Sequence, residues 1–149
     1  MGRDEIRADF QNELFDTLDR ARSRAKPRYV FGERYVVGAD LPGVPRPLHF
    51  ATRFNWNNPR DDSDAGGTPE VVLVVSPEAK PQIAALAASE ADIRNILGSG
   101  SRWFLNRTRW NFALAGPPTD LRVADERDRA VQWTALAMDK LIDATRSLL

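Results

Sequence analysis

Two short stretches place an indole beside arginine and asparagine side chains, at residues 53–60 (RFNWNNPR) and 107–112 (RTRWNF). An aromatic ring flanked by guanidinium and amide groups can stack on a nucleic-acid base or dock against a polar protein surface. The same residues also suit an ordinary strand with an apolar inner face and a polar outer face. Both stretches are therefore candidate binding surfaces, and two kinds of partner have to be weighed.

The first candidate is a protein-binding sheet face. If the strands that contain the two stretches are neighbours, five residues could share this face: Arg53, Asn55, Trp103, Arg107 and Arg109. An exposed aromatic side chain surrounded by arginines is the usual composition of a hot spot for protein binding. We therefore expect a protein partner, and a second copy of the chain, forming a homodimer, is one such partner.

The second candidate is an accessory module that binds nucleic acid through stacked aromatic rings and cations. The residues for this function would be Arg53, Trp56, Arg107, Arg109 and Trp110. Single-stranded nucleic acid binds best to a groove with excess positive charge. Lys+Arg and Asp+Glu balance at 21 each, so the chain has no overall positive field. The charge balance favours a protein partner over nucleic acid.

The composition removes most catalytic and metal chemistry. The chain has no cysteine, which excludes disulfides, zinc-thiolate sites and iron–sulfur ligation, and its single histidine makes a histidine-based metal site improbable. His49 falls on the polar side of its strand without a nearby carboxylate or hydroxyl partner. Glu78-Ala79-Lys80 matches the last element of a metal-dependent nuclease core, but it lies between two prolines and cannot continue a central strand. We expect no catalytic residue, no metal and no cofactor.

The stretch from 58 to 69 is the longest exposed loop that the sequence predicts, because it combines prolines, glycines and aspartates. Asp62, Asp64 and Gly67 match positions one, three and six of a calcium-binding loop. The twelfth position, which needs a bidentate glutamate, is Leu73 inside an apolar strand. A solvated acidic loop is the better interpretation.

Hydrophobic periodicity predicts the elements that must position these residues. Spacings of three and four predict helices over 4–25, from 76–78 through 97, and over 125–149. Apolar alternation or unbroken apolar runs predict one or two strands in 29–39, strands at 48–56 and 70–75, and either one long strand or a hairpin over 101–114. The order is α-βββ-α-β(β)-α, which predicts a single α+β domain spanning 1–149.

The domain should contain a mainly antiparallel sheet with helices packed on one face and the opposite face open to solvent or a partner. No apolar run approaches the roughly 20 residues that a membrane span requires, and the charged start at residues 3–5 lacks the apolar core of a signal peptide. We expect no membrane contact and a cytoplasmic location.

Two resemblances cover the chain. The element order is similar to the type III secretion chaperone-like fold, which implies a small, dimeric, non-enzymatic binder of other proteins. The stretch FQNELF at 10–15, together with 83–97 and the terminal helix at 133–141, resembles an uncharacterised bacterial domain family found beside or fused to nucleases in defence loci. Neither resemblance implies a functional residue, because fold analogy alone does not carry function.

Overall fold

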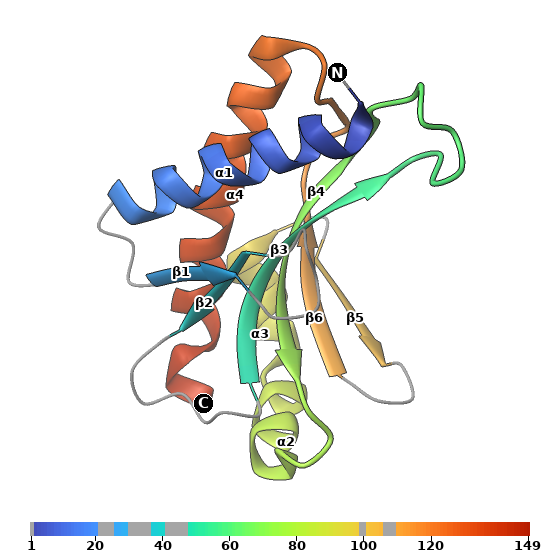
Figure 1. The fold of residues 1–149 in the computed structure, drawn as a ribbon. Helices are drawn as coiled ribbons and strands as arrows, with labels where there is room; N and C mark the ends of the chain where they lie inside the picture. Colours follow the sequence, from blue (N-terminus) through green and yellow to red (C-terminus); the bar gives the residue numbers. More distant parts are fainter. Residues whose placement is uncertain (1, 21–25, 30–36, 41–47, 99–100, 106–109) are drawn as a thin grey trace.

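The first helix buries one apolar stripe, as its sequence spacing predicts. This helix is α1 (Arg3–Arg20), the first element of the fold (Figure 1). The computed structural model describes residues 2–20, 26–29, 37–40, 48–98, 101–105 and 110–149. The buried apolar residues of α1 recur every four positions: Ile6, Phe10, Leu14 and Leu18. Asp4 and Glu5 lie in the first turn, where negative charge complements the helix dipole.

The sheet is entirely antiparallel and follows the order β1-β2-β3-β4-β6-β5. Its strands are β1 (Lys26–Tyr29), β2 (Val37–Asp40), β3 (Leu48–Trp56), β4 (Gly66–Val75), β5 (Ser101–Leu105) and β6 (Trp110–Ala115), and the short β7 (Thr119–Asp120) pairs with the start of β4. β4 is the central strand, paired with β3 on one side and with β6 on the other. Its apolar run at 71–75 is buried on both faces, as expected for that position.

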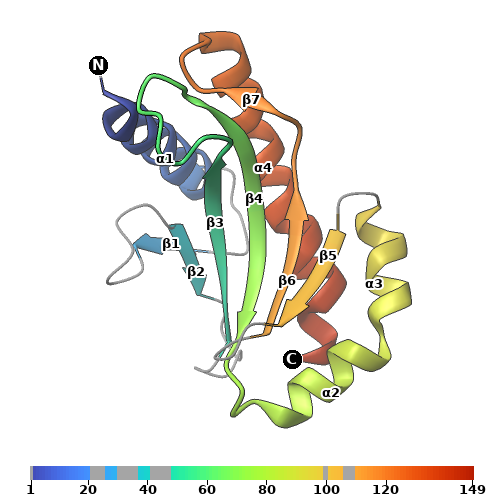
Figure 2. The ribbon, with the colours of Figure 1, turned by 90° about the vertical axis from the view of Figure 1, so that its right-hand side faces the viewer.

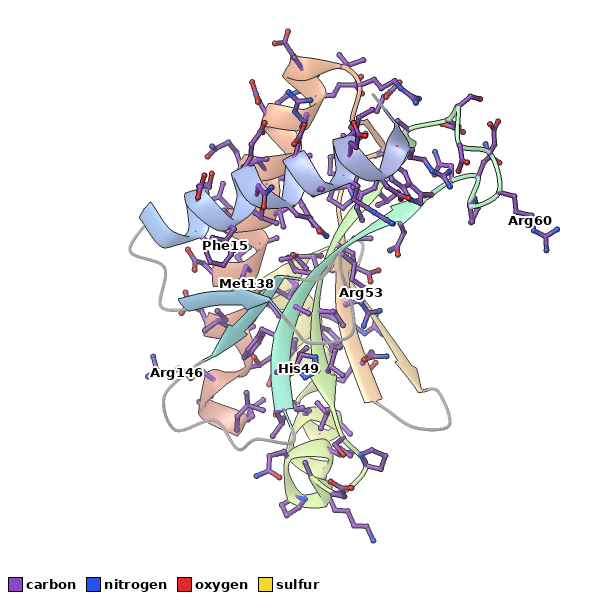
Figure 3. The ribbon with its side chains drawn as sticks, viewed as in Figure 1. Phe15, His49, Arg53, Arg60, Met138 and Arg146 are labelled. Atoms are coloured by element: carbon purple, nitrogen blue, oxygen red, sulfur yellow. The ribbon has the colours of Figure 1, made fainter. Side chains whose placement is uncertain are left out.

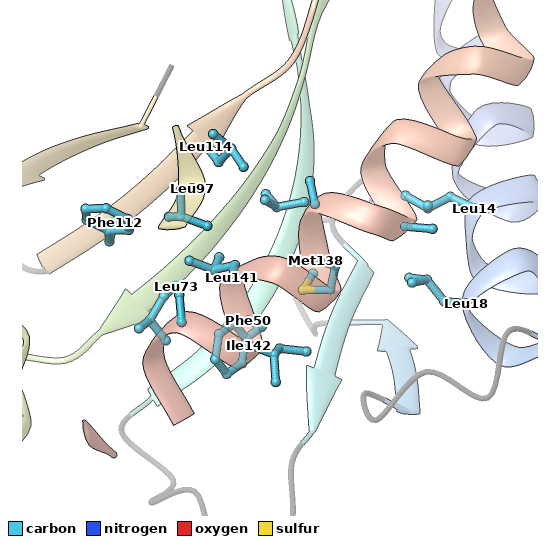
Figure 4. Packing of buried hydrophobic residues seen from close by; sticks show 14 of the residues in the cluster. Leu14, Leu18, Phe50, Leu73, Leu97, Phe112, Leu114, Met138, Leu141 and Ile142 are labelled. Carbon is cyan, nitrogen blue, oxygen red and sulfur yellow. The ribbon is translucent and has the colours of Figure 1, made fainter. Parts of the chain in front are cut away.

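All four helices pack against the same face of the sheet. They are α1, α2 (Lys80–Ala88), α3 (Glu90–Leu97) and α4 (Ala124–Thr145), and a short 3-10 turn, η1 (Arg146–Leu148), follows α4. One hydrophobic cluster joins their buried side chains to the alternate residues of the sheet, for example Met138 and Leu141 to Phe50, Leu73 and Phe112 (Figure 4). Figure 2 shows α3 and α4 together on one side of the strands. The predicted α+β class, with helices on one face of an antiparallel sheet, is confirmed.

The predicted second helix consists of two helices that meet at Ser89. The backbone N–H of Ser89 donates to the carbonyls of Ala85 and Leu86, which tightens the last turn of α2 and lets α3 begin at Glu90. Leu86, Ile93 and Leu97 are buried on both sides of this break. Because their helical spacing continues across Ser89, periodicity alone does not reveal the break.

The structure selects one strand alternative and moves the start of another strand. β5 and β6 are adjacent and antiparallel, which agrees with the hairpin alternative for 101–114. β4 starts at Gly66 rather than at residue 70, although its Gly-Gly-Thr-Pro start is typical of a loop. A Cβ atom at Gly67 would lie 2.3 Å from the carbonyl oxygen of Asn55 and 2.5 Å from the Phe54 ring. Glycine is therefore needed for close pairing with β3.

The face of the sheet opposite the helices carries a second, smaller cluster of buried residues. It consists of Ala51, Val72, Val74 and Ala113, each at most 3% exposed. The prediction that this outer face is open to solvent is therefore wrong at its centre.

Among the residues that the structure describes, no helix is both long and apolar enough to cross a bilayer.

Candidate interaction surface

One accessible part of the outer face, among the described residues, lies at the end of β3 that leads into the β3–β4 loop. Strand alternation puts Arg53 and Asn55 on this face, and Figure 3 shows Arg53 and His49 on the side of β3 away from Met138 of α4. Arg53 is the register partner of Glu70, and its Nη1 lies 3.9 Å from the Glu70 carboxylate. The Arg53 side chain is 26% exposed, and Asn55 is exposed. A guanidinium and an amide can therefore be reached here side by side.

The other three residues predicted for protein binding were expected on a strand next to that of Arg53. β4 lies between β3 and β6, so the condition that the two strands are neighbours is not met. Trp103 lies on β5 as the register partner of Phe112 of β6, and both β4 and β6 lie between β5 and β3. Arg107 and Arg109 lie outside the described residues.

Trp56, one of the two aromatic residues predicted for nucleic-acid binding, packs against the main core cluster. The other, Trp110, pairs in register with Val75 of β4. The guanidinium carbons of Arg3 and Arg7 lie 4.8 and 5.1 Å from the centre of the Trp56 ring. The Phe54 ring meets the same indole edge-on, at 5.0 Å between ring centres. The Trp56 ring is therefore already used by contacts within the chain.

The loop between β3 and β4, residues 57–65, is held by Arg3 at the start of α1. Arg3 Nη1 donates to the carbonyls of Asn58 at 2.7 Å and Asp61 at 2.8 Å, and Nη2 donates to the carbonyl of Pro59 at 2.7 Å. Arg3 Nη2 also lies 3.2 Å from the Asp62 carboxylate. The guanidinium thus fills the oxygen-lined centre of the loop. The weak calcium-loop pattern in the sequence corresponds to a loop that holds an arginine.

A second arginine holds the other side of this loop. Arg122, which follows β7, donates through Nη1 to the carbonyl of Ser63 and through Nη2 to the carbonyl of Asp62 at 3.4 Å. Because Arg3 and Arg122 come from opposite ends of the chain, the loop is tied to both α1 and the segment before α4. The sequence contains no pattern that predicts either contact, since each arginine donates to backbone carbonyls rather than to particular side chains.

The aspartates of the loop are engaged in local hydrogen bonds. The Asp61 carboxylate accepts from the hydroxyl and backbone N–H of Ser63 at 2.6 and 3.0 Å, and these bonds lower the pKa of Asp61 below its ordinary value of 3.8. The Asp64 carboxylate accepts from the backbone N–H of Gly66 at 2.8 Å and from the Asn58 amide at 2.5 Å, which likewise lowers its pKa. Both carboxylates therefore stabilise the loop in their charged form.

The remaining candidate chemistry lies elsewhere in the fold. His49 is half-buried on β3, and Glu78 is exposed in the turn before α2, where it accepts a hydrogen bond from Ser76. No group of three or more potential metal-ligating side chains occurs within the described ranges.

A polar groove of about 500 Å³ lies between α1 and α4 and is lined by Glu13, Asp16, Thr17, Asp128, Val131 and Gln132. Next to it, the ion pair of Arg127 with Glu13, at 3.4 Å, links the two helices.

Comparisons with known proteins add no family to this picture. No family model, no curated protein and no solved structure matches the chain. The resemblances to the chaperone-like fold and to the nuclease-associated bacterial domain therefore stay predictions, and function has to be argued from the surface of this chain alone.

Proposed function

We propose that this chain is a non-catalytic protein-interaction domain, acting in the cytoplasm, that binds its partner at the loop end of the outer sheet face. The observation that carries the proposal is the pair of Arg53 and Asn55. Both side chains are accessible on the sheet face that the four described helices leave uncovered, next to the buried Glu70. Arginine is enriched at protein interfaces because its planar guanidinium donates in several directions.

A protein partner is better supported than nucleic acid. Stacking of bases needs an aromatic face that is free, whereas the Trp56 ring is flanked by Arg3 and Arg7 and touched by Phe54. The equal numbers of acidic and basic residues also provide no long-range attraction for a polyanion. The residues with which we propose to test binding are Arg53 and Asn55; the contributions of Trp103, Arg107 and Arg109 stay predictions.

The proposal is tested by affinity capture with matched variants. The wild-type chain, the double variant Arg53→Gln with Asn55→Ala, and the control Lys140→Gln on the exposed side of α4 are each immobilised and exposed to an extract of the organism that encodes the chain. We expect a protein that the wild type and the control retain and that the double variant loses. Equal retention by all three chains would contradict the proposed surface.

Light scattering coupled to size exclusion distinguishes the remaining partners. A second copy as the partner predicts a dimer that persists at moderate salt and dissociates in the Arg53→Gln, Asn55→Ala variant. A nucleic-acid-binding accessory module of a defence or nuclease system predicts co-elution with a single-stranded oligonucleotide at low salt only. Co-elution of that kind, with no retained protein, would overturn the protein-binding function.

A further inference from the structure

The loop at 57–65 is supported by two arginines from outside the loop. Arg3 donates three hydrogen bonds of 2.7 to 2.8 Å to its backbone carbonyls, and Arg122 donates to two more carbonyls from the opposite side. The Arg3 side chain is only 7% exposed, although it contacts an exposed loop. Figure 1 shows the loop extending past the start of α1 at the edge of the molecule. Its backbone is thus held in one shape before any partner arrives.

Arg60 occupies the outer end of this supported loop. It is exposed, and Figure 3 shows its side chain directed away from the body of the molecule. Its sequence neighbours Asp61 and Asp62 are engaged elsewhere, Asp61 with Ser63 and Asp62 with Arg3. None of the hydrogen bonds or ion pairs within the described part of the chain involves Arg60. A rigid loop therefore presents an uncommitted guanidinium to solvent.

The local charges allow an acidic partner to approach this guanidinium. Asp61, Asp62 and Asp64 are balanced by Arg3, Arg60 and Arg122, so the loop and its two anchors carry no net charge. A planar guanidinium binds a carboxylate through two parallel hydrogen bonds. Phosphate recognition in proteins commonly uses a cluster of arginines, whereas this loop end has one exposed arginine. The chemistry therefore favours a carboxylate.

We propose that residues 57–65 form a preformed docking loop and that Arg60 binds a carboxylate in an acidic segment of the partner protein. This inference rests on the proposed protein-binding function and extends its surface from Arg53 and Asn55 along the loop that follows β3. Because the loop is already ordered by Arg3 and Arg122, binding does not have to order its backbone, and this lowers the entropic cost of association.

The direct test is an NMR titration of the ¹⁵N-labelled chain that follows the side-chain Nε–H signals of arginine. The probe is the tripeptide acetyl-Asp-Glu-Asp-amide, with acetyl-Asn-Gln-Asn-amide and inorganic phosphate as comparisons. We expect the acidic peptide to shift Arg60 Nε–H and the loop amides in a saturable way, whereas Arg146, exposed on the other side of the molecule, shifts little (Figure 3). Arg60→Ala should abolish the shifts of the loop amides, and Arg146→Ala should leave them unchanged.

Three outcomes would overturn the inference. Equal shifts at Arg60 and Arg146 would mean that the peptide pairs nonspecifically with arginines. Loop shifts that persist in Arg60→Ala would mean that the peptide binds at another site. A stronger response to phosphate than to the peptide would assign the loop to a different ligand. Equal unfolding temperatures of wild type and Arg60→Ala verify that the fold is intact.

Binding of the captured partner protein to the variants tests this inference separately from the proposed function. Arg60→Ala should weaken its binding about tenfold or more, as expected for loss of a charge-assisted hydrogen bond. A partner lost by Arg53→Gln with Asn55→Ala but bound normally by Arg60→Ala would refute the docking loop and keep the function. If no partner depends on Arg53 and Asn55, the proposed function itself fails.

Discussion

Arg3 shows how a single side chain can replace a bound cation in organising a loop. Its guanidinium donates to the carbonyls of Asn58, Pro59 and Asp61 and also lies over the Trp56 ring. A buried guanidinium costs free energy unless its hydrogen-bonding capacity is used, and here loop carbonyls accept from Nη1 and Nη2, whereas the buried Nε has no hydrogen-bond partner in the described parts of the chain. Among the loop aspartates, Asp62 forms an ion pair with Arg3, whereas Asp61 and Asp64 accept hydrogen bonds from residues of the loop and its end.

Replacing Arg3 should destabilise the whole fold. Arg3→Ala removes several charge-assisted hydrogen bonds and leaves the loop carbonyls without their donor, so we expect the free energy of unfolding to fall by roughly 2–3 kcal/mol. Urea denaturation measures this change. The matched control is Arg129→Ala, an exposed arginine of α4, which should change the free energy by less than about 0.5 kcal/mol. Equal effects of the two substitutions would contradict the role of Arg3 as a loop anchor.

The loop aspartates should make stability depend on acid pH. Hydrogen bonds lower the pKa of Asp61 and Asp64 in the folded state below the ordinary value of 3.8. Groups with a lowered folded pKa bind fewer protons when folded, so their contribution is complete well above pH 3.8 and disappears as the pH falls below it through the folded pKa. Thermal unfolding between pH 5 and pH 2.5 should therefore show a loss of stability that is smaller in Asp64→Asn. The same slope in both chains would rule out this linkage for Asp64.

At the scale of elements, α4 provides the largest buried helical surface of the described fold. It buries ten residues, among them Met138, Leu141 and Ile142, against the central strands. Leu136 of the same helix is 68% exposed. The buried Leu141 and the exposed Leu136 are the same residue type on the same helix. Replacing each with alanine changes helix propensity equally, so the difference between the two variants measures packing.

Shortening a leucine side chain of α4 to alanine should lower the free energy of unfolding only on the packed side of the helix. Leu141→Ala leaves a cavity under the sheet and should lower the free energy of unfolding by about 2–5 kcal/mol. Leu136→Ala should alter it by less than about 0.5 kcal/mol, because little surface changes its environment. Chemical denaturation of both variants checks the pair. A comparable loss in the two variants would mean that α4 is not packed as the structure describes.

The pairing of β3 with β4 depends on a glycine. A side chain at Gly67 would collide with the carbonyl of Asn55 and the ring of Phe54, so Gly67→Ala should cost about 1–3 kcal/mol through overpacking. Gly2→Ala is the control, since no atom lies within 4 Å of the added Cβ. Thermal unfolding of both variants would expose the difference, and an unchanged Gly67→Ala protein would show that the strands do not approach so closely.

At the scale of the whole molecule, strand order decides which residues can form one surface. β4 separates β3 from β6, and the register row across these strands is Arg53, Glu70 and Ala115. Neighbouring strands lie about 4.8 Å apart, so positions two strands apart exceed the distance that a disulfide can bridge. The accessible surface around Arg53 therefore continues along β3 and into its loop rather than across to β6.

The absence of natural cysteines makes this order testable by cross-linking. Asn55→Cys with Thr68→Cys joins direct register partners and should form a disulfide under mild oxidation. Arg53→Cys with Ala115→Cys should not, because β4 lies between the two positions. Mass spectrometry of the oxidised proteins distinguishes the pairs. Efficient cross-linking of the second pair would require a different sheet order. It would support the predicted surface that spans the stretches at 53–60 and 107–112.

Local patterns were enough to predict the α+β class and the residues that enter the core. Helical spacing in α1, strict alternation in β3 and the apolar run of β4 are set by backbone geometry and solvent contact alone, so a reader of the sequence can find them. The same alternation predicts that Arg53 and Asn55 share one face and Trp56 the other. No local pattern, however, states which strands become neighbours.

Strand order, the support of the loop and the exposure of its residues were decided only by tertiary structure. β4 enters between β3 and β6 because long-range pairing buries its apolar run on both faces, and this separates the two tryptophan-containing stretches. Arg3 and Arg122 reach the loop from distant parts of the chain and bind backbone carbonyls, which every residue possesses. Contacts of this kind carry no sequence signature, because they depend on the path of the backbone rather than on the identity of the residues that accept them.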